Sequence, residues 1–213
     1  MSFKIDFRFV EIEYELSALQ EYIRTLDSQL PILEKREREE LEKRIHEQNL
    51  DEADASMEYD QHHDLIKRVV PRFFRGPVLV TLWAIYESGV QEVASHIQNK
   101  QSWALASRDI RGDNKLAQFK KYYEYILKFP LITSDPARER IEMLQVLRNA
   151  LAHGNGRKDA VKDWEKIEKW SQTNKGIIAD HDYLMFTGAF VQETFTIVSD
   201  SLRDLIQRTK SAY

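Results

Sequence analysis

PVLVTLWAIYESGVQEVASHI, residues 77–97, is the stretch that decides the fold class. Its large apolar residues are spaced alternately four and three apart, the pattern of a helix that buries one face. They are Leu79, Trp83, Tyr86, Val90, Val93 and Ile97. Glu87 lies at the edge of this stripe, where a buried carboxylate would need a partner. We predict a core helix of five turns or more.

The segment before this helix also has helical spacing. Residues 3 to about 50 predict long helices, with apolar residues four and three apart at Leu19, Ile23, Leu26, Leu30 and Leu33. We expect Pro31 to kink or restart the helix, since it lacks the amide donor. Residues 49–59 are acidic and carry no apolar pattern, so we interpret them as a loop or linker.

After the core helix, the pattern predicts a turn over residues 110–115 and a helix ending near Phe129. Asp135 and Pro136 form a helix start signal, and Gly154 is expected to end that helix in the left-handed conformation. A short helix over 163–170, a brief extended segment over 175–183 and a final amphipathic helix follow. The residues expected to face inward are Leu116, Phe119, Tyr123, Ile126, Ile141, Leu144, Leu147, Leu151, Val191, Phe195, Val198, Leu202 and Leu205.

Composition agrees with an all-α protein. The chain has 213 residues, 42% of them hydrophobic, which suits one domain with its own core. Seven Gly and five Pro leave little turn chemistry for many short strands. We divide the chain into an amino-terminal helical segment, residues 1–60, which is part of the bundle or appended to it, and a helical domain over residues 61–213.

Several classes of function and location are excluded or disfavoured. The chain has no Cys, which excludes disulfides, thiolate zinc sites and a cysteine nucleophile, and fits a reducing cytoplasm. The amino terminus has no signal pattern, and the longest apolar run, residues 78–86, is too short to span a bilayer. His62, His63 and Asp64 are not repeated at ligand spacing, so we expect no metal site. We expect no cofactor and no membrane partner.

Charge limits how the chain would hold a nucleic acid. The net charge is −4, and a protein that grips many phosphates is usually basic. Any nucleic-acid contact is therefore expected to be local or to come from a composite surface in an oligomer. A modest basic cluster around Pro71 contains Lys67, Arg68, Arg72 and Arg75. We interpret it as helix-end surface, and the alternative is a phosphate contact.

The segment LRNALAHGNGR, residues 147–157, carries the most informative motif. Arg148 and His153 resemble the Arg-x4–6-His signature of HEPN-superfamily ribonucleases, with Asn149 as the polar residue that often follows the arginine. The resemblance covers roughly residues 70–208. It implies a helical bundle, a homodimer that places both motifs in one interfacial cleft, and RNA as substrate. It also implies a role as a toxin or antiviral effector, with a cognate antitoxin protein as a possible partner.

The chemistry of these residue types fits RNA cleavage. RNA supplies its own nucleophile, the 2′-hydroxyl, so no metal is needed to activate water. His153 suits the proton acceptor, and Arg148 suits stabilisation of charge on phosphorus. Asn149 shares a helix face with His153, and Glu87 is expected to lie within hydrogen-bonding reach of Arg148 and to orient it.

Two alternatives remain open. In the structural alternative, Arg148 pairs with Glu87 across two helices and His153 caps a helix end. The corresponding function is a non-catalytic helical dimer that binds a partner protein or a nucleotide.

Overall fold

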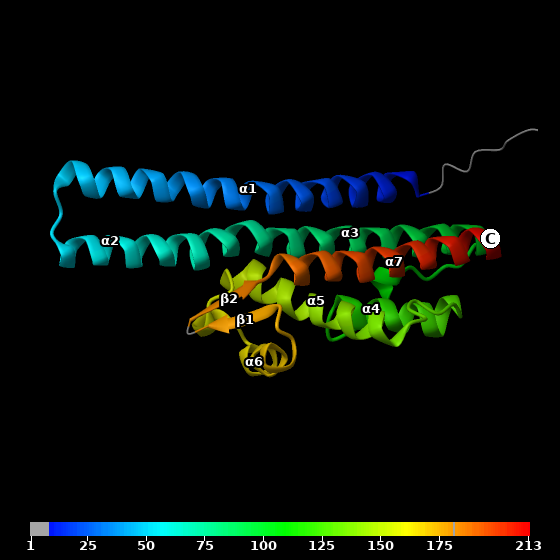
Figure 1. The fold of residues 1–213 in the computed structure, drawn as a ribbon. Helices are drawn as coiled ribbons and strands as arrows, with labels where there is room; N and C mark the ends of the chain where they lie inside the picture. Colours follow the sequence, from blue (N-terminus) through cyan, green and yellow to red (C-terminus); the bar gives the residue numbers. More distant parts are fainter. Residues whose placement is uncertain (1–8, 181) are drawn as a thin grey trace, which may run out of the picture. The chain divides into compact units, whose positions relative to one another are not determined.

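The protein is described by a computed structural model that covers residues 9–180 and 182–213. These residues are mostly helical, as the sequence predicts, with one small antiparallel hairpin (Figure 1). The α-helices are α1 (Val10–Gln48), α2 (Glu52–Asp64), α3 (Val70–Gln101), α4 (Lys115–Lys121), α5 (Asp135–Gly154), α6 (Trp164–Thr173) and α7 (Gly188–Ala212). The strands are β1 (Ile177–Asp180) and β2 (Tyr183–Phe186). Single π-helical turns, η1 (Leu65–Val69) and η3 (Tyr122–Leu127), and 3-10 turns, η2 (Ser107–Asp109) and η4 (Lys158–Ala160), complete the described elements.

The contacts group the chain into two compact units, each assembled from separated stretches. Unit 1 contains the described part of residues 1–19 together with residues 79–149 and 193–213, and unit 2 contains residues 20–78 and 150–192. Helices α1, α3, α5 and α7 each contribute residues to both units. The boundary expected near residue 60 stays a prediction. No described helix has both the length and the apolar character needed to cross a membrane.

Unit 1 is built around α3. Every member of the predicted apolar stripe from Leu79 to Ile97 is buried, and so are the predicted inward residues of α7. Gly89 allows α3 and α7 to approach closely, because a Cβ there would lie only 2.9 Å from Leu202 Cδ2. Between α3 and α7 in the sequence, α4 contributes the buried Phe119, and η3 contributes Tyr123, whose hydroxyl donates to the Val90 carbonyl at 2.8 Å.

Helix α1 passes through Pro31 without ending. Of the two outcomes predicted at that position, the restart is therefore wrong, and the kink stays a prediction. Pro31 is exposed, and the buried positions Leu19, Ile23 and Leu26 before it are followed by buried Leu41 after it. The packing face therefore continues on both sides of the proline, which offsets the loss of one backbone hydrogen bond.

The loop expected over residues 49–59 is also wrong, since the chain turns within three residues and enters α2 (Figure 1). The Asp51 side chain caps α2 by accepting from the Asp54 amide at 2.9 Å, and Glu52 and Asp54 place negative charge in the first turn. Helix α2 has no buried residue. Its sequence consequently lacks an apolar stripe even though it is helical.

Two parts of unit 2 bear on the sequence predictions, the carboxyl end of α5 and the hairpin. Helix α5 includes Gly154, and the left-handed residues are Asn155 (φ 48°) and Gly156 (φ 67°), so the expectation that Gly154 itself would be left-handed is wrong. Gly154 is instead buried against Ala160 and Val161. The extended segment predicted over 175–183 is present and continues to Phe186 as the second strand of the hairpin.

Candidate functional site at the end of α5

Arg148, Asn149 and His153 lie in the last two turns of α5. The helix forms there because Ile141, Leu144 and Leu147 supply a buried stripe, all three fully buried. The polar residues of the motif follow at positions off this stripe. Asn149 and His153 are exposed, and Arg148 is half-buried.

The Arg148 guanidinium keeps unused hydrogen-bonding capacity. One terminal nitrogen donates to the Asn149 side-chain oxygen at 3.0 Å. Its Nε is buried and has no hydrogen-bond partner in the part of the chain that the structure describes. No carboxylate of residues 9–180 or 182–213 forms an ion pair with it. Because this Nε is buried, an anionic ligand would have to bind the terminal nitrogens of the guanidinium.

Glu87 does not bond to Arg148 in the described residues, so the pairing expected from the sequence is not formed. The Glu87 carboxylate instead accepts from the indole Nε1 of Trp83, one turn earlier on α3, at 2.8 Å. An i,i+4 hydrogen bond within one helix satisfies the half-buried carboxylate locally. The structural alternative, in which Glu87 neutralises Arg148, is absent for the same reason.

The His153 side chain has no hydrogen bond or ion pair among the described residues, and it is exposed in the last turn of α5. The terminal carbonyls of the helix are used by the backbone, since the Asn155 amide donates to Leu151 and the Gly156 amide to Ala150, both at 3.0 Å. His153 is therefore not engaged as a hydrogen-bonding cap. Its imidazole is available to a ligand.

The regular helix keeps Arg148 and His153 on different faces. Five residues of α-helix turn the chain by about 500°, which leaves the two side chains about 140° apart around the axis. The two side chains could converge in two ways, through a helix that relaxes at Gly154 or through a second chain that supplies one of them. Since α5 remains helical through Gly154, the relaxed helix is not observed. A site completed by a second chain stays a prediction.

Unit 2 contains an arginine stacked on two aromatic rings, a contact that the sequence did not predict. The Arg72 guanidinium lies over the Tyr183 ring at 4.0 Å and over the Phe73 ring at 4.8 Å, measured to the ring centroids. Arg72 belongs to the basic cluster noticed in the sequence, where a phosphate contact was the alternative interpretation. Tyr183, more than a hundred positions away, carries no local signal that would join it to Arg72.

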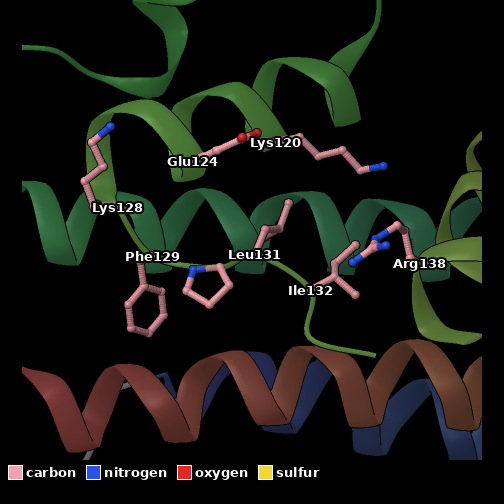
Figure 2. Close-up of a pocket in the computed structure, with 8 residues that line it drawn as sticks. Lys120, Glu124, Lys128, Phe129, Leu131, Ile132 and Arg138 are labelled. Carbon is pink, nitrogen blue, oxygen red and sulfur yellow. The ribbon is translucent and has the colours of Figure 1, made fainter. Parts of the chain in front are cut away.

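Unit 1 contains a separate pocket of about 520 Å³, shown in Figure 2. Lys120 and Lys128 come from α4 and the turn after η3, Arg138 comes from α5, and the connecting loop supplies an apolar floor of Phe129, Pro130, Leu131 and Ile132. Two of the three cations are paired, Lys120 with Glu142 and Arg138 with Asp135. The Lys128 Nζ lies 6.0 Å from the centroid of the Tyr125 ring and forms no ion pair with any described residue.

Across residues 9–180 and 182–213, no three His, Asp or Glu side chains are grouped as a metal ion would require. Comparison with protein-family models, with curated proteins and with solved structures finds no match to this chain.

Proposed function

We propose that the chain is a metal-independent endoribonuclease of the HEPN type, which cuts RNA through attack by the 2′-hydroxyl. The observation that carries the proposal is the state of the motif on α5. His153 is exposed and unengaged, and the Arg148 guanidinium is bonded only to its neighbour Asn149 in the described chain. A half-buried arginine with a purely structural role would be expected to have a carboxylate partner.

The proposed reaction balances without a metal or cofactor. His153 accepts the proton of the 2′-hydroxyl, and the 2′-oxygen forms a bond to phosphorus. The bond from phosphorus to the 5′-oxygen breaks, and that oxygen takes a proton from water and leaves as a 5′-hydroxyl, while protonated His153 returns its proton to the solvent. Arg148 stabilises the charge that develops on the phosphoryl oxygens, and Asn149 holds the guanidinium through its side-chain oxygen.

The proposed site belongs to a homodimer. Within one helix the two catalytic side chains point about 140° apart, so an arginine from one chain and a histidine from its partner make the joint site. A two-fold contact through the ends of the two α5 helices would bring both motifs into one cleft.

The test uses purified protein, single-stranded RNA and EDTA. We expect cleavage that leaves a 2′,3′-cyclic phosphate, or its hydrolysed form, and a 5′-hydroxyl. His153→Ala should reduce the rate by about 10²–10⁴, and Arg148→Ala by about 10²–10³. A 2′-deoxy nucleotide at the cut site should block the reaction, because the nucleophile is missing.

His46→Ala is the matched control, since His46 is also an exposed histidine in the last turn of a helix. It should cleave like the unchanged chain. Cleavage that needs a divalent cation, or that survives in His153→Ala, contradicts the proposed mechanism.

The cellular role proposed with this activity is that of a cytoplasmic toxin or antiviral effector held in check by a cognate antitoxin protein. Only the resemblance of residues 147–157 supports this role. Toxicity on expression that disappears in His153→Ala is the corresponding observation in cells.

The pocket in unit 1 favours a second candidate, a module that binds a nucleotide without cutting RNA. Its volume suits a small ligand, and Lys128 is the lining cation without a carboxylate partner among the described residues. If this candidate is correct, calorimetry should detect nucleotide binding that Lys128→Ala weakens, and the chain should not cleave RNA.

A further inference from the structure

The Arg72 side chain is held in an unusual setting for a surface cation. Its guanidinium lies over two aromatic rings, Tyr183 at 4.0 Å and Phe73 at 4.8 Å. Arginine is the residue best suited to this arrangement, because its planar group stacks on rings while the edge N–H groups stay free to bind. We refer to Arg72, Phe73 and Tyr183 as the stacked platform.

Within the part of the chain that the structure describes, no carboxylate compensates the charge of Arg72. Its Nε is buried without a hydrogen-bond partner, and no described residue forms an ion pair with it. The two nearby arginines differ. Arg75 donates to the Phe186 carbonyl at 3.0 Å and lies 3.9 Å from Asp27, and Arg157 makes two bonds to Asp159.

Phe73 adds an open aromatic face. Its side chain is 53% exposed, although Phe at a helical position is ordinarily turned toward a core. An exposed ring beside an uncompensated guanidinium offers both a stacking surface and a phosphate-binding group. These are the two features by which proteins hold single-stranded RNA, whose unstacked bases lie on aromatic or guanidinium planes.

The backbone ties this platform to the end of α5. Tyr183 forms a β-bridge with Arg157, and the Leu184 amide donates to the Gly156 carbonyl at 2.8 Å. Arg157 is four residues after His153, so their Cα atoms are at most about 14 Å apart. About four stacked nucleotides, at about 3.4 Å each, cover that length. All of these residues belong to unit 2.

We propose that the stacked platform is a binding subsite for single-stranded RNA, in which Arg72 contacts a phosphate and Phe73 stacks on a base flanking the cut site. This inference rests on the proposed ribonuclease function for the identity of the strand. It also accounts for how a chain with net charge −4 can hold RNA, since a local stacked contact replaces a broad basic surface.

Binding is measured separately from cleavage. The full-length His153→Ala protein is titrated into a fluorescent single-stranded RNA, and anisotropy gives the dissociation constant at several salt concentrations. Adding Arg72→Gln should weaken binding about tenfold and lower the salt slope by about 1. Arg72→Lys should recover part of the affinity, because it keeps the charge but not the planar stack.

Phe73→Ala is the second variant, since it removes an exposed ring and leaves the contact between Arg72 and Tyr183 in place. It should also weaken binding, about fivefold, with an unchanged salt slope. Arg24→Gln is the matched control. Arg24 is an exposed arginine of the same unit, lies 3.5 Å from Glu21 and makes no ring contact among the described residues. It should bind like the parent protein.

The outcomes separate the two proposals. If the unchanged chain cleaves RNA but Arg72→Gln and Phe73→Ala keep both KM and binding, the platform is overturned and the ribonuclease stands. If no cleavage is found but binding depends on Arg72 and Phe73, the ribonuclease fails and the platform stands. Full recovery of affinity by Arg72→Lys would overturn the stacking role. Should Arg72→Gln unfold, Phe73→Ala decides the question.

Discussion

Tyr86 carries a buried hydroxyl with nothing to bond to in the described chain. The residue is 1% exposed, and burial raises the pKa of its phenol, so the group is neutral at ordinary pH. A buried polar group without a partner costs about 1–3 kcal/mol. Tyr86→Phe should therefore raise the free energy of unfolding by about 1 kcal/mol, measured by urea denaturation.

Tyr123 is the matched control for this prediction. It is equally buried in unit 1, but its hydroxyl donates to the Val90 carbonyl at 2.8 Å. Tyr123→Phe removes that bond and should lower the free energy of unfolding by about 1 kcal/mol. Equal effects of the two substitutions would show that the Tyr86 hydroxyl has a partner in solution.

Single-residue chemistry was predictable from the sequence where the signal was local. The motif residues Arg148, Asn149 and His153 lie in the last turns of a helix that ends at Gly154, as the sequence predicted. Asn149 and His153 are exposed. The partner of Glu87 was not predictable in the same way. A donor one turn away, the Trp83 indole N–H, competes with any distant arginine for the Glu87 carboxylate, and spacing alone does not rank them. The role of these residues in catalysis stays a prediction.

At the scale of elements, the continuity of α1 can be tested through Pro31. An interior proline lacks the amide donor and its ring clashes with the carbonyl one turn earlier, at a cost of about 3 kcal/mol. Pro31→Ala should therefore raise the free energy of unfolding by about 1–3 kcal/mol if the helix is continuous, as described. Chemical denaturation gives the value.

Ile32→Ala provides the control, because Ile32 is the next residue and is 59% exposed. Its replacement should change stability by no more than about 0.5 kcal/mol. If Pro31→Ala has an effect as small as this control, the helix is broken at Pro31 in solution and the restart predicted from the sequence is correct after all.

Elements with a buried stripe were predictable, and elements without one were not. Helices α3, α5 and α7 each bury residues at helical spacing, and their existence follows from that pattern. Helix α2 buries none, so only the weaker signal of Asp51 as a cap before Glu52 and Asp54 marked it. The hairpin was recognised only as an extended stretch, because each strand has four residues and gives little alternation.

At the scale of the whole molecule, the sequence predicted helical content but not how the chain divides. Contacts assemble each unit from separated stretches, and helices such as α5 change unit in mid-length, between Asn149 and Ala150. Periodicity identifies which face of a helix is buried. It carries no information on which partner covers each half, since that depends on long-range packing.

The assembly prediction follows from the geometry of α5. If Arg148 and His153 of one chain cannot face the same phosphate, the active species must be a dimer, and light scattering at micromolar concentration should give about twice the 25.2 kDa chain mass. A stable monomer that cleaves RNA would contradict a site shared between two chains.

Mixing two inactive variants tests the shared site directly. When Arg148→Ala and His153→Ala proteins are combined and allowed to exchange, about half of the dimers contain one chain of each. In such a dimer one site receives the intact Arg148 and the intact His153 from different chains, while the other site receives neither.

Activity should then return to about a quarter of the unchanged protein, because half of the dimers have one of two sites restored. If each chain held a complete site of its own, both variants would remain inactive after mixing. Each variant incubated alone supplies the baseline, and light scattering on the same samples checks that the dimer is retained.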